Sequence, residues 1–166
     1  PVNAIITKGH PLFLSERVGR NGKKFSVIKF RSMKKEVNPR LTSESIDLDT
    51  NVTKFGRFLR KTSIDETLQL FNIFVGQMSF IGPRPLIDVG VDKITIEERK
   101  ENDSIKLRPG LGGYAQVHGR VNVSAEEKGK LDGYYYKHIC LWLDIKLFFM
   151  TLFKTARKED VEKADF

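Results

Sequence analysis

The sequence predicts an α+β fold that is mostly helical, with one β-hairpin near its N-terminus. Three observations support this: strand-like runs flank an Asn-Gly turn, helical spacing of apolar residues dominates the rest, and no shift in composition marks a boundary. The chain has 166 residues, 40% of them hydrophobic, which is enough to bury a core. We therefore expect one domain over residues 1–166.

The hairpin is predicted by two alternating stretches. Residues 12–18 and 24–33 contain β-branched and aromatic residues, and Asn21-Gly22 between them is a strong turn signal. Lys29 lies on the second of these strands. Residues 36–50 are polar and predict a loop.

Two helical segments are expected in the middle of the chain. Residues 53–61 place aromatic residues on one side and cations on the other, as in an amphipathic helix. Ser63 is suited to capping a second helix, and Glu66 three positions later completes a capping box. This helix should run to Gly76. Its core-facing residues would be Leu68, Phe71 and Val75.

Three more helices are expected, over residues 92–102, 125–137 and 141–157. The last is rich in aromatic residues and carries cations at its end, but Asp144 and Lys146 interrupt it, so it is a poor spanning helix. This pattern fits an amphipathic helix lying in a membrane interface, or a core helix with solvated ends. The residues alone leave both interpretations open.

Two loops carry residues suited to binding anions. Arg84 stands between two prolines, which hold its guanidinium ready to bind phosphate or carboxylate. In residues 108–120, glycines would let backbone amides approach an anion, while Gln116 and Arg120 could hydrogen-bond sugar or phosphate oxygens. The alternative is a surface turn with a solvated arginine.

Adjacent carboxylates at Asp65 and Glu66 are the strongest catalytic candidates. They lie in the first turn of the predicted helix, after a stretch of cations that includes Arg60. Such a pair could hold Mg²⁺, attack phosphorus as a nucleophile, or only cap the helix.

The net charge of +8 and the isoelectric point near 9.6 indicate an anionic partner. Nucleic acid, an anionic membrane surface and a phosphorylated substrate all fit, although no nucleic-acid motif is recognisable, so we expect no nucleic-acid partner. A single cysteine excludes an internal disulfide. Residues 1–10 are mildly apolar and too short to span a bilayer, and we interpret them as the remnant of a membrane helix further upstream.

Five motifs in order closely resemble the bacterial sugar transferase family, the monotopic phosphoglycosyl transferases. They are KFRSM at 29–33, TKFGRFLRKTSIDETLQLFN at 53–72, GQMSFIGPRPL at 76–86, RPGLGGYAQVHGR at 108–120 and LWLDIKLFFMTLFK at 141–154. One departure is Thr67-Leu68, where Leu-Pro is usual in the family.

The resemblance implies a two-step transfer of a sugar-1-phosphate from a UDP-sugar to undecaprenyl phosphate, with release of UMP. Asp65 would be the nucleophile that forms a phosphosugar intermediate, and Glu66 would help to hold Mg²⁺. Arg84 matches an arginine that contacts the phosphates of the nucleotide-sugar. Other matching positions, with roles less defined, are Lys29, Arg60 and Asp132.

The same resemblance implies a place for the reaction, the cytoplasmic face of the bacterial inner membrane, at the first membrane step of glycan assembly. An N-terminal membrane segment would anchor the protein beside its lipid substrate. Two other classes of function are weighed against this enzyme. One is a non-catalytic basic module that binds anionic membranes, and the other is a nucleotide-sugar enzyme without a lipid acceptor.

Overall fold

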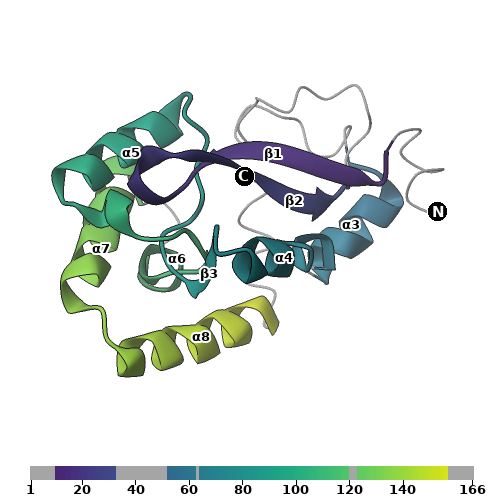
Figure 1. The fold of residues 1–166 in the computed structure, drawn as a ribbon. Helices are drawn as coiled ribbons and strands as arrows, with labels where there is room; N and C mark the ends of the chain where they lie inside the picture. Colours follow the sequence, from purple (N-terminus) through teal and green to yellow (C-terminus); the bar gives the residue numbers. More distant parts are fainter. Residues whose placement is uncertain (1–9, 33–51, 63, 120–122, 157–166) are drawn as a thin grey trace.

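The computed structural model describes residues 10–32, 52–62, 64–119 and 123–156, which fold into helices packed around two small sheets (Figure 1). The strands are β1 (Leu12–Val18), β2 (Lys24–Phe30), β3 (Ser79–Ile81) and β4 (Gly110–Gly112). The α-helices are α3 (Lys54–Lys61), α4 (Gln69–Phe74), α5 (Val91–Glu101), α6 (Tyr114–His118), α7 (Ala125–His138) and α8 (Leu141–Ala156). Short 3₁₀ turns are η1 (Arg20–Gly22), η3 (Ile64–Glu66) and η4 (Ser104–Lys106). The predicted α+β class is confirmed.

The N-terminal hairpin forms where the sequence predicts it. β1 and β2 pair in antiparallel register from Leu12 opposite Phe30 to Val18 opposite Lys24. Asn21 and Gly22 at the turn have φ of 57° and 74°, a left-handed conformation that asparagine and glycine tolerate best. The predicted loop over residues 36–50 and the predicted remnant helix over residues 1–10 lie outside the described residues, except for His10.

The carboxylates are not in the first turn of an α-helix, so that prediction is wrong. Asp65 and Glu66 lie in η3, and α4 begins only at Gln69, without a side-chain cap. The hydroxyl of Thr67 donates to the carbonyl of Ile64 at 2.7 Å, and the Thr67 amide donates to the same oxygen at 3.2 Å. Such local bonds compete with α-helical hydrogen bonds, which explains the tight turn before the helix. Ser63 lies outside the described residues.

The buried face of α4 is polar, contrary to the prediction from its apolar spacing. Gln69 and Asn72 are the buried residues of α4, whereas Phe71 is 59% exposed and Phe74 87% exposed. Asn72 binds the neighbouring strand β2: its amide donates to the carbonyl of Ser26 at 2.8 Å, and its oxygen accepts from the amide of Ile28 at 3.2 Å. Hydrogen bonding to a strand therefore sets the orientation of this helix.

A second sheet, absent from the prediction, joins the two expected loops. β3 and β4 pair in parallel, and the Gly82 amide donates to the carbonyl of Gly112 at 2.9 Å. A side chain at Gly82, Gly110 or Gly113 would collide with backbone of the opposite segment. These glycines thus let two stretches of the protein's own backbone approach each other. The sequence had predicted instead that they let backbone amides approach a bound anion.

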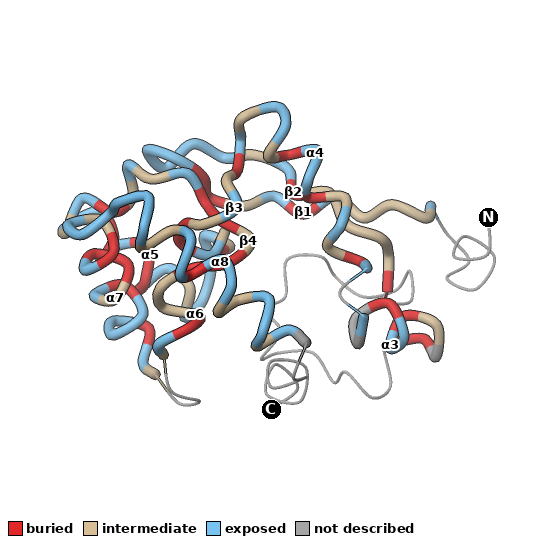
Figure 2. Tube along the Cα trace, turned by 90° about the horizontal axis from the view of Figure 1, so that it is seen from below, coloured by how far each residue is buried: buried red, intermediate tan, exposed pale blue. Residues whose placement is uncertain are grey.

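α8 lies along one edge of the molecule and exposes most of its apolar side chains (Figures 1 and 2). Leu147 is fully buried, in a cluster with Val117 and Tyr135, whereas Trp142 is 77% and Phe153 64% exposed. This exposure disagrees with the interpretation of residues 141–157 as a core helix with solvated ends. Among the described residues, none of the helices combines the length and the apolar character that crossing a membrane requires.

Candidate active site

One face of the hairpin supplies two cations to the carboxylates of η3. In the register of β1 and β2, Arg17 lies opposite Phe25 and Phe13 lies opposite Lys29. Since alternate residues of a strand share a face, Arg17 and Lys29 project from the same side of the hairpin. The two are separated by the buried pair of Ser15 and Val27.

Lys29 forms an ion pair with Glu66. Its Nζ lies 2.7 Å from Oε1 of the carboxylate, and the two side chains are 24% and 37% exposed. Burial alone would raise the pKa of Glu66, but attraction by Lys29 and Arg84, together with hydrogen bonds from Lys29 and Gln69, lowers it to about 2. Glu66 is therefore ionised at all physiological pH values.

Asp65 lies beside Glu66 in the same 3₁₀ turn but is more buried, with only 8% of its surface exposed. The two acids differ in exposure, since the side chain of Glu66, which Lys29 and Gln69 bind, is 37% exposed. Pairs of acids in unlike environments take different chemical roles in many active sites. The structure thus brings Asp65, Glu66 and Lys29 together, as the sequence predicts.

Arg84 lies in the loop between β3 and α5, and its side chain is exposed. Its backbone is held from two sides: the carbonyl of Pro83 accepts from the Gly110 amide at 2.9 Å, and the carbonyl of Arg84 accepts from Arg99 Nη1 at 2.9 Å. The loop is therefore rigid, and it places the Arg84 guanidinium close enough to Glu66 to lower its pKa. This joins a fourth predicted residue to the site.

Arg17 is a member of the site that sequence reasoning missed. Burial lowers its pKa, and repulsion by Arg84 lowers it further, while Asp92 and Glu66 oppose this shift. An arginine remains protonated despite such a shift, so the site holds a third cation. The alternation of side chains along the two predicted strands could have placed Arg17 on the same face of the hairpin as Lys29.

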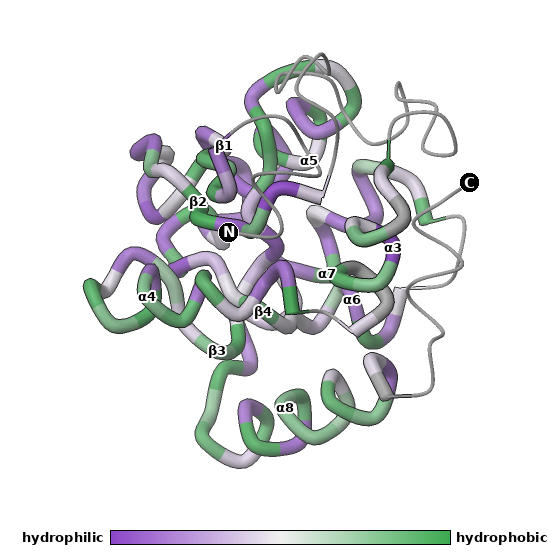
Figure 3. Tube along the Cα trace, turned by 90° about the vertical axis from the view of Figure 1, so that its right-hand side faces the viewer, coloured by the Kyte–Doolittle hydropathy of each residue, from purple (hydrophilic) through white to green (hydrophobic). Residues whose placement is uncertain are grey.

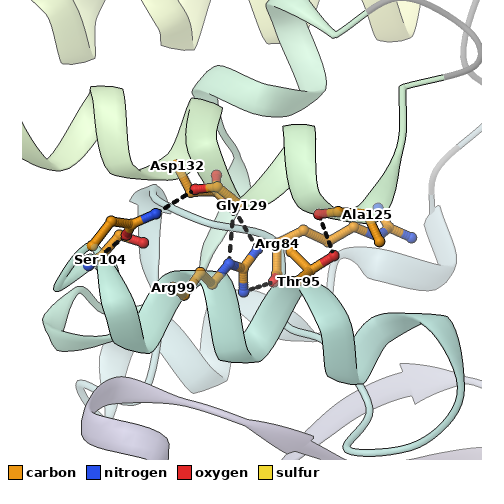
Figure 4. Close-up of polar contacts among 8 residues, drawn as sticks. Arg84, Thr95, Arg99, Ser104, Ala125, Gly129 and Asp132 are labelled. Carbon is orange, nitrogen blue, oxygen red and sulfur yellow. Dashed lines mark hydrogen bonds and ion pairs between the residues drawn. The ribbon is translucent and has the colours of Figure 1, made fainter.

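Asp132 is buried, whereas a residue that binds substrate directly would be accessible from the solvent. It is only 1% exposed, on α7, and its Oδ2 accepts from Arg99 Nε at 2.8 Å and Nη2 at 2.7 Å (Figure 4). Burial raises the pKa of Asp132, and the attraction of Arg99 opposes this. In this conformation Asp132 can influence a substrate only through other residues.

The remaining predicted residues are not brought to the carboxylates by the described contacts. Gln116 lies in α6, where its carbonyl accepts from Lys154 Nζ of α8 at 3.0 Å, and its side-chain oxygen is buried with no hydrogen-bond partner among the described residues. Arg60 belongs to α3, but its side chain lies outside the described part of the chain, as does all of Arg120. Their proposed roles remain predictions.

A hollow of about 240 Å³ lies between η1, β3, η4 and the end of α7. Arg20, Lys106 and Arg108 line it, together with apolar side chains. None of the predicted site residues does so. We place the candidate active site at the carboxylates because two acids and several cations gather there, whereas the residues that line the hollow include cations but no acid.

A pair of adjacent carboxylates with cations beside it is suited to chemistry on a phosphate-bearing substrate, which defines the protein as a candidate phosphoryl-group transferase. The comparison with known families agrees. The model of the family "Bacterial sugar transferase" matches residues 2–158. The chain belongs to this family, which confirms the resemblance seen in the sequence.

Several curated relatives share more than a third of their aligned residues with the chain. The UDP-glucose:undecaprenyl-phosphate glucose-1-phosphate transferase of Escherichia coli (strain K12) is 35% identical over 151 residues, covering 88% of the chain and 32% of the relative. The undecaprenyl-phosphate galactose phosphotransferase of Salmonella typhimurium is 35% identical over 164 residues, covering 90% and 33%.

A shorter relative is the uncharacterized sugar transferase EpsL of Bacillus subtilis (strain 168). It is 34% identical over 158 residues, covering 95% of the chain and 76% of the relative. The chain thus spans about one third of the length of the longer relatives and most of this one.

Proposed function

We propose that the protein transfers a sugar-1-phosphate from a UDP-sugar to undecaprenyl phosphate and releases UMP. The observation that carries this proposal is the Asp65-Glu66 pair, placed beside Lys29 and within the electrostatic reach of Arg84. The names of the relatives support the substrates, because they include transferases that act on UDP-glucose and undecaprenyl phosphate.

In the first step, the Asp65 carboxylate attacks the phosphorus that carries the sugar. A bond forms between a carboxylate oxygen and phosphorus, the bond to the bridging oxygen of the diphosphate breaks, and UMP leaves with that electron pair. In the second step, a phosphate oxygen of undecaprenyl phosphate attacks the same phosphorus and releases the Asp65 carboxylate. The product is a polyprenyl diphosphate sugar, and atoms and charge balance over both steps.

The environments of the two acids favour Asp65 as the nucleophile. Glu66 is held by Lys29 and Gln69, and its low pKa of about 2 makes it a weak nucleophile. Asp65 is 8% exposed, so water has little access to the mixed anhydride that it would form. Arg84, and Arg17 beside it, would neutralise the phosphate oxygens during the attack.

The carboxylates also fit a Mg²⁺ ion, which we propose as the cofactor. Oxygen ligands suit Mg²⁺, which commonly uses one or two carboxylates and completes its shell with water and substrate phosphates. Among the described residues, no group of three or more His, Cys, Asp or Glu side chains could hold an ion. Glu66 would therefore hold Mg²⁺ jointly with the diphosphate, and the ion would neutralise phosphate charge. EDTA should abolish turnover and added Mg²⁺ restore it; full activity in EDTA would remove the metal from the proposal.

The test of the reaction is UMP release by the full natural chain from a panel of UDP-sugars, with Mg²⁺, undecaprenyl phosphate and detergent. We expect release that depends on the lipid and falls at least 1,000-fold in Asp65→Asn, because an amide cannot replace the nucleophile. Asp103→Asn is the matched control, since Asp103 forms only an exposed ion pair with Lys106. Near-normal turnover by Asp65→Asn would exclude this mechanism, and no release from any UDP-sugar would favour the non-catalytic membrane module.

We propose further that the protein works at a membrane surface. Exposed aromatic residues lie on α4, β3 and α8, three elements on the same part of the molecule (Figure 3). Phe80 of β3 meets Phe148 of α8 edge to face, with 6.1 Å between the ring centroids. An exposed aromatic face of this kind suits insertion into a lipid headgroup region. The net charge of +8 would add attraction to anionic lipids.

A further inference from the structure

Arg99 is a buried arginine with three engaged donors. It lies in α5 with only 5% of its surface exposed. Nε and Nη2 donate to Oδ2 of Asp132 on α7, at 2.8 Å and 2.7 Å (Figure 4). Nη1 donates at 2.9 Å to the backbone carbonyl of Arg84. One guanidinium thus joins two helices to the loop that carries an arginine of the candidate active site.

Other contacts already hold α5 and α7 together without the ion pair of Arg99 and Asp132. Thr95 Oγ1 of α5 donates to the carbonyl of Ala125 at 2.9 Å, and Asn102 donates to the carbonyl of Gly129 at 2.9 Å (Figure 4). Glycines at 129 and 133 let α5 and Asn102 approach closely. Burying two charges carries a desolvation cost, and apolar residues of similar size often replace such a pair without loss of stability. Helix packing alone therefore does not account for Arg99.

The contact with Arg84 is the part that an apolar residue cannot supply. Pro85 has no backbone N–H, so this residue offers no hydrogen-bond donor that could anchor the loop around Arg84. The two successive carbonyls of Pro83 and Arg84 are instead held from opposite partners, Gly110 and Arg99. Asp132 accepts two donors of the same guanidinium, which leaves Nη1 aimed at the loop.

We propose that Arg99 is a positioning residue that fixes the backbone of Arg84, and that Asp132 orients Arg99 for this task. The proposal rests on the proposed function, in which the Arg84 side chain binds the phosphates of the nucleotide-sugar. It gives Asp132 a role in the reaction without contact with the substrate. Small displacements of a positioning group reduce rates by one to two orders of magnitude, so the Arg99 contact should matter to turnover.

The decisive variant replaces both charges, as Arg99→Met with Asp132→Leu, and is here called the apolar-pair variant. We expect it to fold with wild-type circular dichroism while UMP release falls at least tenfold. In an Arg84→Ala background, the same two changes should cause no further fall, because the residue that Arg99 positions is gone. Equal losses in both backgrounds, or unchanged release in the folded variant, would overturn the proposal.

Hydrogen exchange at the Gly110 amide provides a readout independent of activity, since this amide donates to Pro83 beside Arg84. It should exchange at least tenfold faster in the apolar-pair variant than in wild type, and an unchanged rate would contradict the proposal. If wild type releases no UMP, the proposed function fails while this measurement still decides the role of Arg99.

Two single variants complete the design. Thr95→Val removes one hydrogen bond between α5 and α7 without touching Arg84, and it should leave Gly110 exchange unchanged. Arg99→Lys keeps the charge but cannot reach Asp132 and the Arg84 carbonyl with one planar fork. If the apolar-pair variant does not fold, Arg99→Lys should show the same faster exchange and slower release, and wild-type values in both would overturn the proposal.

Discussion

Lys29 and Glu66 show how neighbouring cations set the charge of a partly buried acid. The carboxylate is 37% exposed, and burial on its own would favour the neutral form. The ammonium of Lys29 at 2.7 Å and the more distant guanidinium of Arg84 reverse this and lower the pKa of Glu66 to about 2. Lys29 therefore contributes to keeping a negative charge on Glu66 beside Asp65.

This shift predicts how stability depends on pH. The pKa of Glu66 is lower in the folded state, near 2, than its ordinary value of 4.5. The resulting stabilisation is fully present above pH 4.5 and is lost as pH falls toward 2. Lys29→Met should raise the pKa of Glu66, so the variant should not lose this stability as pH falls. The wild type is expected to be more stable than the variant above pH 4.5, and this difference in unfolding free energy should shrink between pH 4.5 and 2. We expect a change of about 1 kcal/mol, a small value because water screens the partly exposed pair.

The measurement is urea unfolding between pH 2 and 6, in the absence of divalent ions. Lys24→Met is the matched control, because Lys24 lies on the same strand and its ion pair with Glu16 at 2.9 Å is largely exposed. Its unfolding free energy should follow the wild-type pH dependence. A parallel pH dependence in Lys29→Met as well would show that Lys29 does not control Glu66.

At the scale of single elements, α4 shows where the pattern in the sequence fails. Spacing of Leu68 and Phe71 indicates a helix, and a helix is present. The direction of its apolar face was predicted wrongly, because Asn72 binds β2 through Ser26 and Ile28, more than forty residues away in the chain. Local periodicity contains no information on a partner at that distance.

The loop around Arg84 was predicted more completely, since two prolines determine its backbone locally. Its anchoring could not be predicted. The partners Arg99 and Gly110 come from α5 and β4, and Arg99 looks in the sequence like one more cation of a charged helix. Four members of the site were thus found from residue type and motif: Asp65, Glu66, Lys29 and Arg84. The residues that hold or supplement them depend on the tertiary fold.

At the scale of the whole molecule, the apolar surface and the charged site lie on different elements. α8 occupies one side of the molecule and β1 the opposite side (Figures 1 and 3). The exposed fractions of Trp142, Phe149 and Phe153 are 77%, 53% and 64%. Such a surface is unusual for a domain that contacts only water, and it predicts partition to lipid bilayers.

Binding should be strongest to vesicles that contain anionic lipid, and it should weaken as salt screens the net charge of +8. Replacing Trp142, Phe149 and Phe153 together by serine should reduce the vesicle partition coefficient at least about 100-fold, because burial of each large apolar side chain contributes about 1 kcal/mol or more. Sedimentation with vesicles of phosphatidylcholine, with and without phosphatidylglycerol, measures this directly.

The control is Leu14→Ser: Leu14 is 61% exposed and belongs to β1, the strand that lies on the opposite side of the molecule from α8. It removes one exposed apolar side chain and should leave binding unchanged, because that side would face away from the bilayer. Equal losses in both variants would indicate a general effect of hydrophobicity, and wild-type binding by the triple variant would exclude α8 from membrane contact. Loss of binding confined to the α8 variant would place the bilayer on the α8 side of the protein.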